Sequence, residues 1–465
     1  MKEKFNENNL KNYTVPEWYE DAKFGIFIHY GVYSEPGFGD EWYGHWMYLK
    51  DAKSWGGDDI YHYHEKEYGG VHNFGYKDFI PKFAEDIRRF HDNLMAEQWA
   101  QLFLRSGAKY VMPVGIHHDS FALYDSNIQN EYNSVKIAGV DYCGLLQKAC
   151  KKLGLHFGIS NHFAENRWFF DKEQGAGTDI EDTRYSQLYG YGLTEEEHVK
   201  KWYDISMEII EKYHPELIYY DFDLQKPEYL PYRRKMLAAY YNMEQEDGKL
   251  NGVVCCYKYG AFEDGEAVLD VERGALKGIR EMHWQTDTSV GTKSWGYTKN
   301  EVFGSARRYL CELVDTVSKN GNFLLNIGPM ADGTIPKKAQ EILEEMGQWL
   351  ERNGEAVYHT RPWRVFGEGP NIDRVKGEFS DEIEYSSCDI RYTRSKDGAY
   401  VYAIVMGKPK EDEIVLSEYH EFPKSAELLE FHQRLEYTVL DGKLKILLRN
   451  IGKMIDDIFV IKIKG

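Results

Sequence analysis

The sequence is poor in cysteine and in positive charge, and it contains no long apolar run. Its six cysteines in 465 residues have no zinc-type CxxC spacing, which indicates free thiols in a reducing compartment rather than a disulfide framework or a structural zinc site. No stretch approaches the roughly 18 consecutive apolar residues of a membrane helix. The net charge of −19 argues against a nucleic acid or an anionic membrane as the partner. These absences favour a globular protein with a neutral ligand.

The N-terminal segment also lacks the apolar stretch of a secretory signal. It reads MKEKFNENNLKNYTVPEWYEDAKFG and is predominantly polar. We therefore expect a cytoplasmic protein, with a secreted protein whose signal was removed as the alternative.

Aromatic side chains, by contrast, are abundant. Phe, Trp and Tyr make up 15% of the chain, with 36 tyrosines and 11 tryptophans. Part of this set belongs in the hydrophobic core. Aromatic rings also form walls against which sugars stack, so a carbohydrate-binding cleft is an alternative use for the remainder.

Short apolar strands alternate with helical stretches over about 350 residues. Eight strands are predicted, at residues 24–31, 109–116, 155–160, 217–223, 252–259, 267–274, 282–290 and 322–329. The spacer between the fifth and sixth strands is too short for a full helix. The alternation predicts a distorted (β/α)8 TIM-like barrel that is irregular at that point.

The pattern changes after a predicted helix that begins at Pro336 and ends at Gly354. Beyond it the apolar residues recur with period two, and hairpin turns are predicted at Asp397-Gly398 and Asp441-Gly442. We therefore expect two domains, a catalytic barrel over residues 1–355 and a C-terminal β-sandwich over residues 356–465.

Polar residues stand at the carboxyl ends of the predicted strands, where the active site of such a barrel lies. They are His29, the run His117-His118-Asp119, the run Ser160-Asn161-His162, Asp221, Lys258 and Glu272. Because side chains alternate along a strand, Tyr219 and Asp221 share one face, and so do Asp270 and Glu272. Two carboxylates and several imidazoles at one mouth indicate hydrolysis of a glycosidic bond or a metal site.

Each of these residues has a less specific interpretation. Asp221 could cap the following loop, and Asp223 is the local alternative for a catalytic carboxylate. The run 117–119 could bind a metal, but the first strand offers the single His29 rather than an HxH pair. The glycine-rich SKNGNFLLNIGPMADG lacks the GK[ST] ending of a phosphate loop and is interpreted as packing around the eighth strand.

Five segments over roughly residues 16–363 resemble the signature blocks of glycoside hydrolase family 29, the retaining α-L-fucosidases. They are DAKFGIFIHYGVYS, EWYGHWM, GAKYVMPVGIHHDSFALYDS, WQTDTSVGTKSWGY and LVDTVSKNGNFLLNIGPMADGTIP. The resemblance implies an exo-acting enzyme without a cofactor that removes terminal α-L-fucose from an oligosaccharide or glycoconjugate by double displacement, and the residue pattern gives no reason to expect a metal. It also implies the barrel and β-sandwich expected above.

The same resemblance implies roles for individual residues. It places the nucleophile on Asp221, at the end of the fourth strand. The fucose-binding residues that it implies are His29, Glu41, Trp42, His117 and His118. Trp42 would offer an apolar wall for the methyl group of the deoxy sugar.

The general acid/base is assigned to Glu272, which has the strand-end position and inward parity that the role requires. Glu281, just before the seventh strand, is the second candidate. Trp284 is included among the sugar contacts, although it and Trp295 also fit a core.

Two loops depart from the family pattern. Lys258 stands where an arginine is expected, and it supplies a point charge without arginine's planar fork. The third strand is followed by GISNHFAENRW rather than a tyrosine motif, so His162, Glu165 and Trp168 are candidates for a subsite that binds the leaving group.

Two other classes of function remain open at this stage, a non-catalytic sugar-binding protein and a metal-dependent barrel hydrolase. Paired carboxylates favour an enzyme over a lectin, which needs no acid and nucleophile. The sequence leaves open the glycosidic linkage, the natural glycan and whether the chain forms a homo-oligomer.

Overall fold

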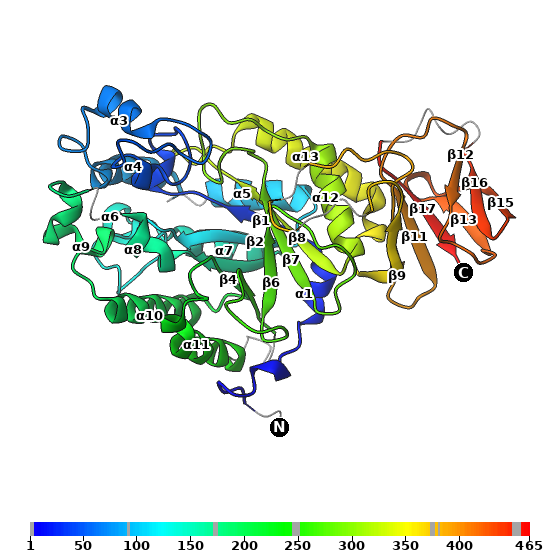
Figure 1. Cartoon of the computed structure of the whole chain (residues 1–465), viewed down its shortest axis with the longest axis horizontal. Helices are drawn as coiled ribbons and strands as arrows, with labels where there is room; N and C mark the ends of the chain where they lie inside the picture. The colour runs from blue at the N-terminus through cyan, green and yellow to red at the C-terminus, as the bar shows by residue number, and fades with distance from the viewer. Residues whose placement is uncertain are drawn as a thin grey trace.

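The computed structural model describes residues 4–90, 94–170, 175–243, 252–372, 377–379, 382–448 and 457–465. It consists of a closed parallel barrel of eight strands, β1 to β8, and a C-terminal domain of antiparallel sheets that lies beside the barrel (Figure 1). The predicted fold class is therefore confirmed. Within the described residues, none of the helices has the length and apolar character needed to span a bilayer.

Each barrel strand overlaps one of the eight predicted segments. The strands are β1 (Phe24–Ile28), β2 (Tyr110–Ile116), β3 (His156–Asn161), β4 (Leu217–Tyr220), β5 (Val254–Tyr257), β6 (Val268–Glu272), β7 (Trp284–Ser289) and β8 (Gly321–Ile327). Neighbouring strands pair in parallel, and β8 closes the barrel against β1.

Thirteen α-helices accompany the barrel strands in the described residues, and they are distributed unevenly among the connections. They are α1 (Glu17–Ala22), α2 (Tyr43–Trp46), α3 (Ile60–Tyr68), α4 (Ile80–Ile87), α5 (Leu94–Arg105), α6 (Ser134–Ala138), α7 (Tyr142–Lys152), α8 (Asn166–Phe169), α9 (Ser186–Tyr189), α10 (Glu195–Tyr213), α11 (Leu230–Asn242), α12 (Ala306–Ser318) and α13 (Lys337–Asn353). The β5–β6 and β6–β7 connections, whose residues are all described, contain no helix. The barrel is thus irregular where the short spacer predicts it.

Side chains alternate along each strand between the barrel interior and the helical layer. Leu217 and Tyr219 of β4 belong to the interior cluster, whereas Ile218 and Tyr220 pack outside it. Helix α1 closes the amino end of the barrel, where the Tyr19 hydroxyl donates to Gln285 Oε1 at 2.7 Å. The carboxyl end is left for a cavity.

The C-terminal domain packs a six-stranded sheet on a three-stranded one. Its strands are β9 (Thr360–Glu368), β10 (Ile390–Ser395), β11 (Tyr400–Val405), β12 (Glu413–Leu416), β13 (Ser425–Leu428), β14 (Gln433–Arg434), β15 (Glu436–Leu440), β16 (Lys443–Leu447) and β17 (Phe459–Lys464). Both predicted hairpins form, β10–β11 and β15–β16. At the second turn Asp441 and Gly442 have φ of 50° and 72°, as a type I′ turn requires.

A buried ion network fixes this domain to the barrel. Asp315 of α12 accepts from Arg391 Nε of β10 and from Lys319 Nζ, each at 2.6 Å. Although burial favours its neutral acid, the two cations hold the pKa of Asp315 below its usual range. The sheet of β9 and β10 is thereby held against α12. Ala275, in the connection between β6 and β7, donates to the carbonyl oxygen of Gly377, which lies between β9 and β10 in the sequence.

Candidate active site

A cavity of about 470 Å³ opens at the carboxyl ends of the barrel strands, the position at which barrel enzymes carry their active sites. It brings together nine of the residues selected from the sequence: His29, Glu41, Trp42, His117, His118, His162, Asp221, Lys258 and Glu272. These residues are distributed over more than half of the chain, so only the closed barrel brings them to one place.

Asp221 follows β4 and keeps the inward direction of Tyr219. Its Oδ1 lies 3.3 Å from Lys258 Nζ, and its Oδ2 lies 3.1 Å from His162 Nδ1 and 3.5 Å from His118 Nε2. Burial alone would raise the pKa of Asp221, but the ammonium of Lys258 and the neighbouring imidazoles hold it well below its usual range. Asp221 is therefore a carboxylate at neutral pH.

Glu272 ends β6 and is also buried. Lys258 Nζ donates to its Oε2 at 2.7 Å. Burial raises the pKa of Glu272 to about 7, with Lys258 opposing this shift and the carboxylates of Asp287 and Asp221 adding to it. Glu272 is thus protonated in a substantial fraction of molecules at neutral pH.

The contacts of Lys258 set an upper limit on the separation of the two carboxyl groups. Because the same ammonium lies 3.3 Å from Asp221 Oδ1 and 2.7 Å from Glu272 Oε2, these oxygens are at most about 6 Å apart. Retaining glycosidases hold their two carboxyl groups about 5 to 5.5 Å apart and inverting ones about 6.5 to 9.5 Å apart. One ionised and one protonated carboxyl at this separation match an acid and a nucleophile.

The imidazoles of His29, His117 and His118 are uncharged at neutral pH. Burial lowers the pKa of His29 and His117 well below the usual range, and it lowers that of His118 to about 3. His118 Nδ1 lies 2.8 Å from the carbonyl oxygen of His162, and His29 Nδ1 lies 2.7 Å from Asn326 Oδ1. Each of these two rings is held by one nitrogen. The second nitrogen of His29 is left for a ligand, and that of His118 lies 3.5 Å from Asp221 Oδ2.

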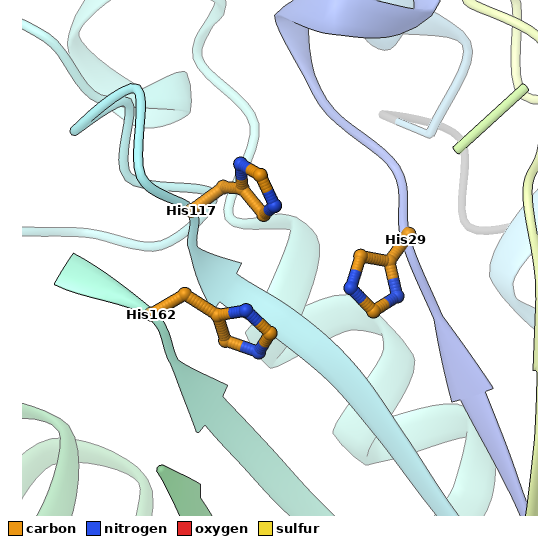
Figure 2. A group of neighbouring side chains, drawn as sticks. All are labelled: His29, His117 and His162. Carbon is orange, nitrogen blue, oxygen red and sulfur yellow. The ribbon is translucent and has the colours of Figure 1, made fainter. Parts of the chain in front are cut away.

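Figure 2 shows that the rings of His29, His117 and His162 are directed toward a common space. One nitrogen from each lies within 4.8 Å of the others, and the same holds for the ligand atoms of His118, His162 and Asp221. His117 Nδ1 and His162 Nε2 make no hydrogen bond within the described part of the chain. These atoms could hold a metal ion, and they could equally bind sugar hydroxyls.

Glu41 and Trp42 line the same cavity. Glu41 Oε2 accepts from Ser294 Oγ and from the backbone nitrogen of Trp295, each at 2.9 Å. The Trp42 ring lies 5.0 Å from His118 and stacks at 6.2 Å on Phe222. An apolar surface therefore stands beside polar groups, as a deoxy sugar requires.

The sequence-based placement of Trp284 is wrong. Trp284 begins β7 at the amino end of the barrel, is fully buried, and donates from Nε1 to the carbonyl oxygen of Lys319. Trp295 lines the cavity instead, 5.3 Å from the ring of His29. Strand position distinguishes the two, because Trp284 begins β7 at the amino end of the barrel, whereas Trp295 follows the carboxyl end of this strand.

The three residues assigned to the leaving-group subsite do not lie together. His162 directly follows β3 and points into the cavity beside Asp221, so its side chain lies at the bottom of the site. Glu165 is buried outside this cavity. Trp168 lines a separate cavity of about 660 Å³, together with Asp223.

The same geometry decides between the alternative candidates for the nucleophile and for the acid/base. Asp223 has φ of 79° and pairs with Lys226 outside the cavity, so it is no substitute for Asp221. Glu281 is exposed just before β7, at the barrel end opposite to Glu272. Of the two acid/base candidates, only Glu272 lines the cavity.

Two residues that contact this site were not identified from the sequence. Asn326 of β8 accepts from His29 and donates from Nδ2 to the carbonyl oxygen of Trp295, so it holds both in place. Asp287 of β7 lies 3.6 Å from Lys258 Nζ and accepts from the Tyr219 hydroxyl at 3.0 Å. The inward parity of Asp287 along WQTDTS was the available signal.

Comparison with known proteins agrees with this geometry. The family profile described as Alpha-L-fucosidase matches residues 2–355, and the Alpha-L-fucosidase C-terminal domain matches residues 384–464. An α-L-fucosidase of Dictyostelium discoideum is 32% identical over 88% of this chain and 82% of its own, and human tissue α-L-fucosidase is 30% identical over 86% and 78%.

A solved structure gives the same result over the full length. The α-fucosidase of Thermotoga maritima, in complex with a mechanism-based inhibitor, has a TM-score of 0.79 and 27% identity over 99% of this chain and 100% of that one. The chain belongs to the α-L-fucosidases, glycoside hydrolases of family 29.

Proposed function

We propose that the enzyme releases terminal α-L-fucose from glycans with retention, through a fucosyl ester on Asp221. The observation that carries the proposal is the pair of buried carboxyl groups that share Lys258, at most about 6 Å apart and with pKa shifts of opposite direction. This combination suits an acid and a nucleophile on the two sides of one glycosidic bond.

In the first step an oxygen of Asp221 bonds to the anomeric carbon while the glycosidic C–O bond breaks. The leaving oxygen takes the proton of Glu272. Because Lys258 donates to Oε2 of Glu272, that proton is carried by Oε1. The developing positive charge on the sugar ring is stabilised by the Asp221 carboxylate beneath it.

In the second step the Glu272 carboxylate takes a proton from water, and the water oxygen bonds to the anomeric carbon. The ester bond to Asp221 breaks, which restores both carboxyl groups to their first states. Lys258 contacts both groups in the structure, so its positive charge limits the negative charge that accumulates between them.

The test is hydrolysis of 4-nitrophenyl α-L-fucoside followed by proton NMR. Two inversions at the same carbon retain configuration, so α-L-fucose is expected as the first product, before mutarotation. First appearance of β-L-fucose would show an inverting enzyme. Absence of turnover would favour the sugar-binding alternative, and loss of turnover in EDTA would favour the metal-dependent one.

The pH dependence of kcat/KM should follow the two carboxyl groups. Activity needs Glu272 protonated, so kcat/KM should fall as pH rises through about 7. The ammonium of Lys258 lowers the pKa of both Asp221 and Glu272. In Lys258→Met, the basic limb of the kcat/KM profile, where activity falls with rising pH, should therefore move to higher pH by about one to three units. The acidic limb of the same profile should also move to higher pH.

Lys258→Arg is the matched control, since it keeps the charge and should leave the basic limb near its original pH. A basic limb in Lys258→Met that coincides with that of the wild type would exclude this electrostatic role. Circular dichroism of each variant checks that loss of the buried cation leaves the fold intact.

A further inference from the structure

The mouth of the catalytic cavity is bordered by exposed aromatic rings. Trp55, Tyr259 and Phe379 line this cavity, although they are 71%, 39% and 62% exposed. A single exposed aromatic residue needs no explanation, but several at one concave site mark a surface that binds something.

Three ring contacts join two of these residues into a continuous wall. Trp55 lies 6.2 Å from Trp42, Trp42 lies 6.2 Å from Phe222, and Phe222 lies 6.4 Å from Tyr259. The two inner rings, Trp42 and Phe222, also contact His118 at 5.0 and 5.4 Å. The wall therefore begins at the fucose-binding imidazoles and ends in solvent at Trp55 and Tyr259.

Phe379 lies on the side from which the leaving group departs. Its backbone nitrogen donates to the carbonyl oxygen of Glu272 at 3.0 Å, and Ala275 donates to the carbonyl oxygen of Gly377 at 3.2 Å. Glu272 delivers its proton to the glycosidic oxygen, so whatever is attached to that oxygen must lie near this acid and near Phe379.

The backbone of Phe379 is held in an uncommon conformation. Its φ of 48° lies in the left-handed region, which residues other than glycine, asparagine and aspartate seldom adopt. The hydrogen bond to Glu272 pairs the backbone of Phe379 with the end of β6, and the ring remains exposed at the mouth.

Polar groups stand between the rings. Arg273 packs its guanidinium 4.6 Å from the Trp295 ring, and Thr292 and Lys293 line the same mouth. Flat apolar surfaces interrupted by hydrogen-bonding groups match the two kinds of surface that a pyranose presents, its C–H face and its hydroxyl edge.

We propose that Trp55, Tyr259 and Phe379 form a subsite for the sugar to which fucose is attached. The inference rests on the proposed function and extends it, because it makes fucosylated oligosaccharides the preferred substrates over fucosides with a small leaving group. The rings would act by positioning the leaving sugar, whereas Asp221 and Glu272 carry out the chemistry.

The test compares α-L-fucosyl fluoride, which has no leaving sugar, with a panel of fucosyl disaccharides of each linkage. Trp55→Ala, Tyr259→Ala and Phe379→Ala should each lower kcat/KM for the best disaccharide by about threefold to tenfold, the range expected for one aromatic contact. Their kcat/KM for the fluoride should stay within about twofold of the wild type. Retained fluoride turnover also shows that each variant is folded.

Phe422→Ala is the matched control, because Phe422 is 77% exposed and does not line the cavity. It should leave both substrates unchanged. Equal losses on fluoride and disaccharide in the three rim variants would mean that the rings only shield the reacting carbon, and unchanged kinetics on both would mean that they bind nothing. Either outcome overturns the subsite, whereas a wild type that hydrolyses neither substrate overturns the proposed function itself.

Discussion

Asp221→Gly should lower the hydrolysis of an α-L-fucoside by roughly 10⁴- to 10⁶-fold, the range found when a covalent nucleophile is removed. Loss of the side chain removes the carboxylate that lies among Lys258, His162 and His118. It also leaves a space beneath the anomeric carbon, next to the Lys258 ammonium. Azide should enter this space, attack the substrate once and give β-L-fucosyl azide, detected by NMR or mass spectrometry.

Asp223→Asn is the matched control for this variant. Asp223 lies two residues away, outside the catalytic cavity, and asparagine tolerates the φ of 79° that the position requires. Its activity should stay within about tenfold of the wild type, because no reacting group is lost. If Asp223→Asn, rather than Asp221→Gly, were the inactive variant and gave the β-azide with rescue, the nucleophile would be Asp223.

The main features of this site could be predicted because alternate residues along each barrel strand point into the barrel, so the position of a residue in its strand gives the direction of its side chain. Once β4 and β6 were located, the alternation through Tyr219 to Asp221 and through Asp270 to Glu272 placed both carboxylates on the barrel axis. The structure has both at one mouth. The regular alternation along the strands therefore predicted the positions of these two carboxylates and of the imidazoles that follow β1 and β2.

Residues on loops could not be placed in the same way. The loop after β3 leaves the axis within three residues, so His162 enters the cavity whereas Glu165 and Trp168 do not. Loop direction depends on packing against the following helix, which period and parity do not encode. Phe379 is a stronger example, since it reaches the mouth only after the chain has formed β9 of the other domain.

The structure shows which groups the lysine that replaces the expected arginine contacts, and the residue type alone could not predict these contacts. The sequence indicated a point charge at position 258. In the structure its ammonium reaches three carboxylates, those of Asp221, Glu272 and Asp287, within 3.6 Å. A single compact cation thus links the nucleophile to the acid, and its removal is expected to change the pH dependence as well as the rate.

Glu272→Ala should affect substrates according to their leaving groups. A glycan needs its departing oxygen protonated, and general acid catalysis contributes about 10²- to 10⁴-fold, so kcat/KM for a fucosyl disaccharide should fall by that factor. An aryl fucoside with a good leaving group needs little protonation, so formation of its fucosyl ester on Asp221 should survive far better. Azide should then attack the accumulated ester and give α-L-fucosyl azide, the anomer opposite to that from Asp221→Gly.

Glu281→Ala is the control that separates the two acid/base candidates. Glu281 is exposed and precedes β7, at the end of the barrel that α1 closes, so its loss should leave the kinetics of both substrates unchanged. Glu272, by contrast, lies 2.7 Å from the ammonium that also contacts Asp221. A dependence on the leaving group and an α-azide product in Glu281→Ala, with wild-type behaviour in Glu272→Ala, would transfer the acid/base role to Glu281. The reverse result assigns the proton to Glu272, on the same side of the sugar as Phe379.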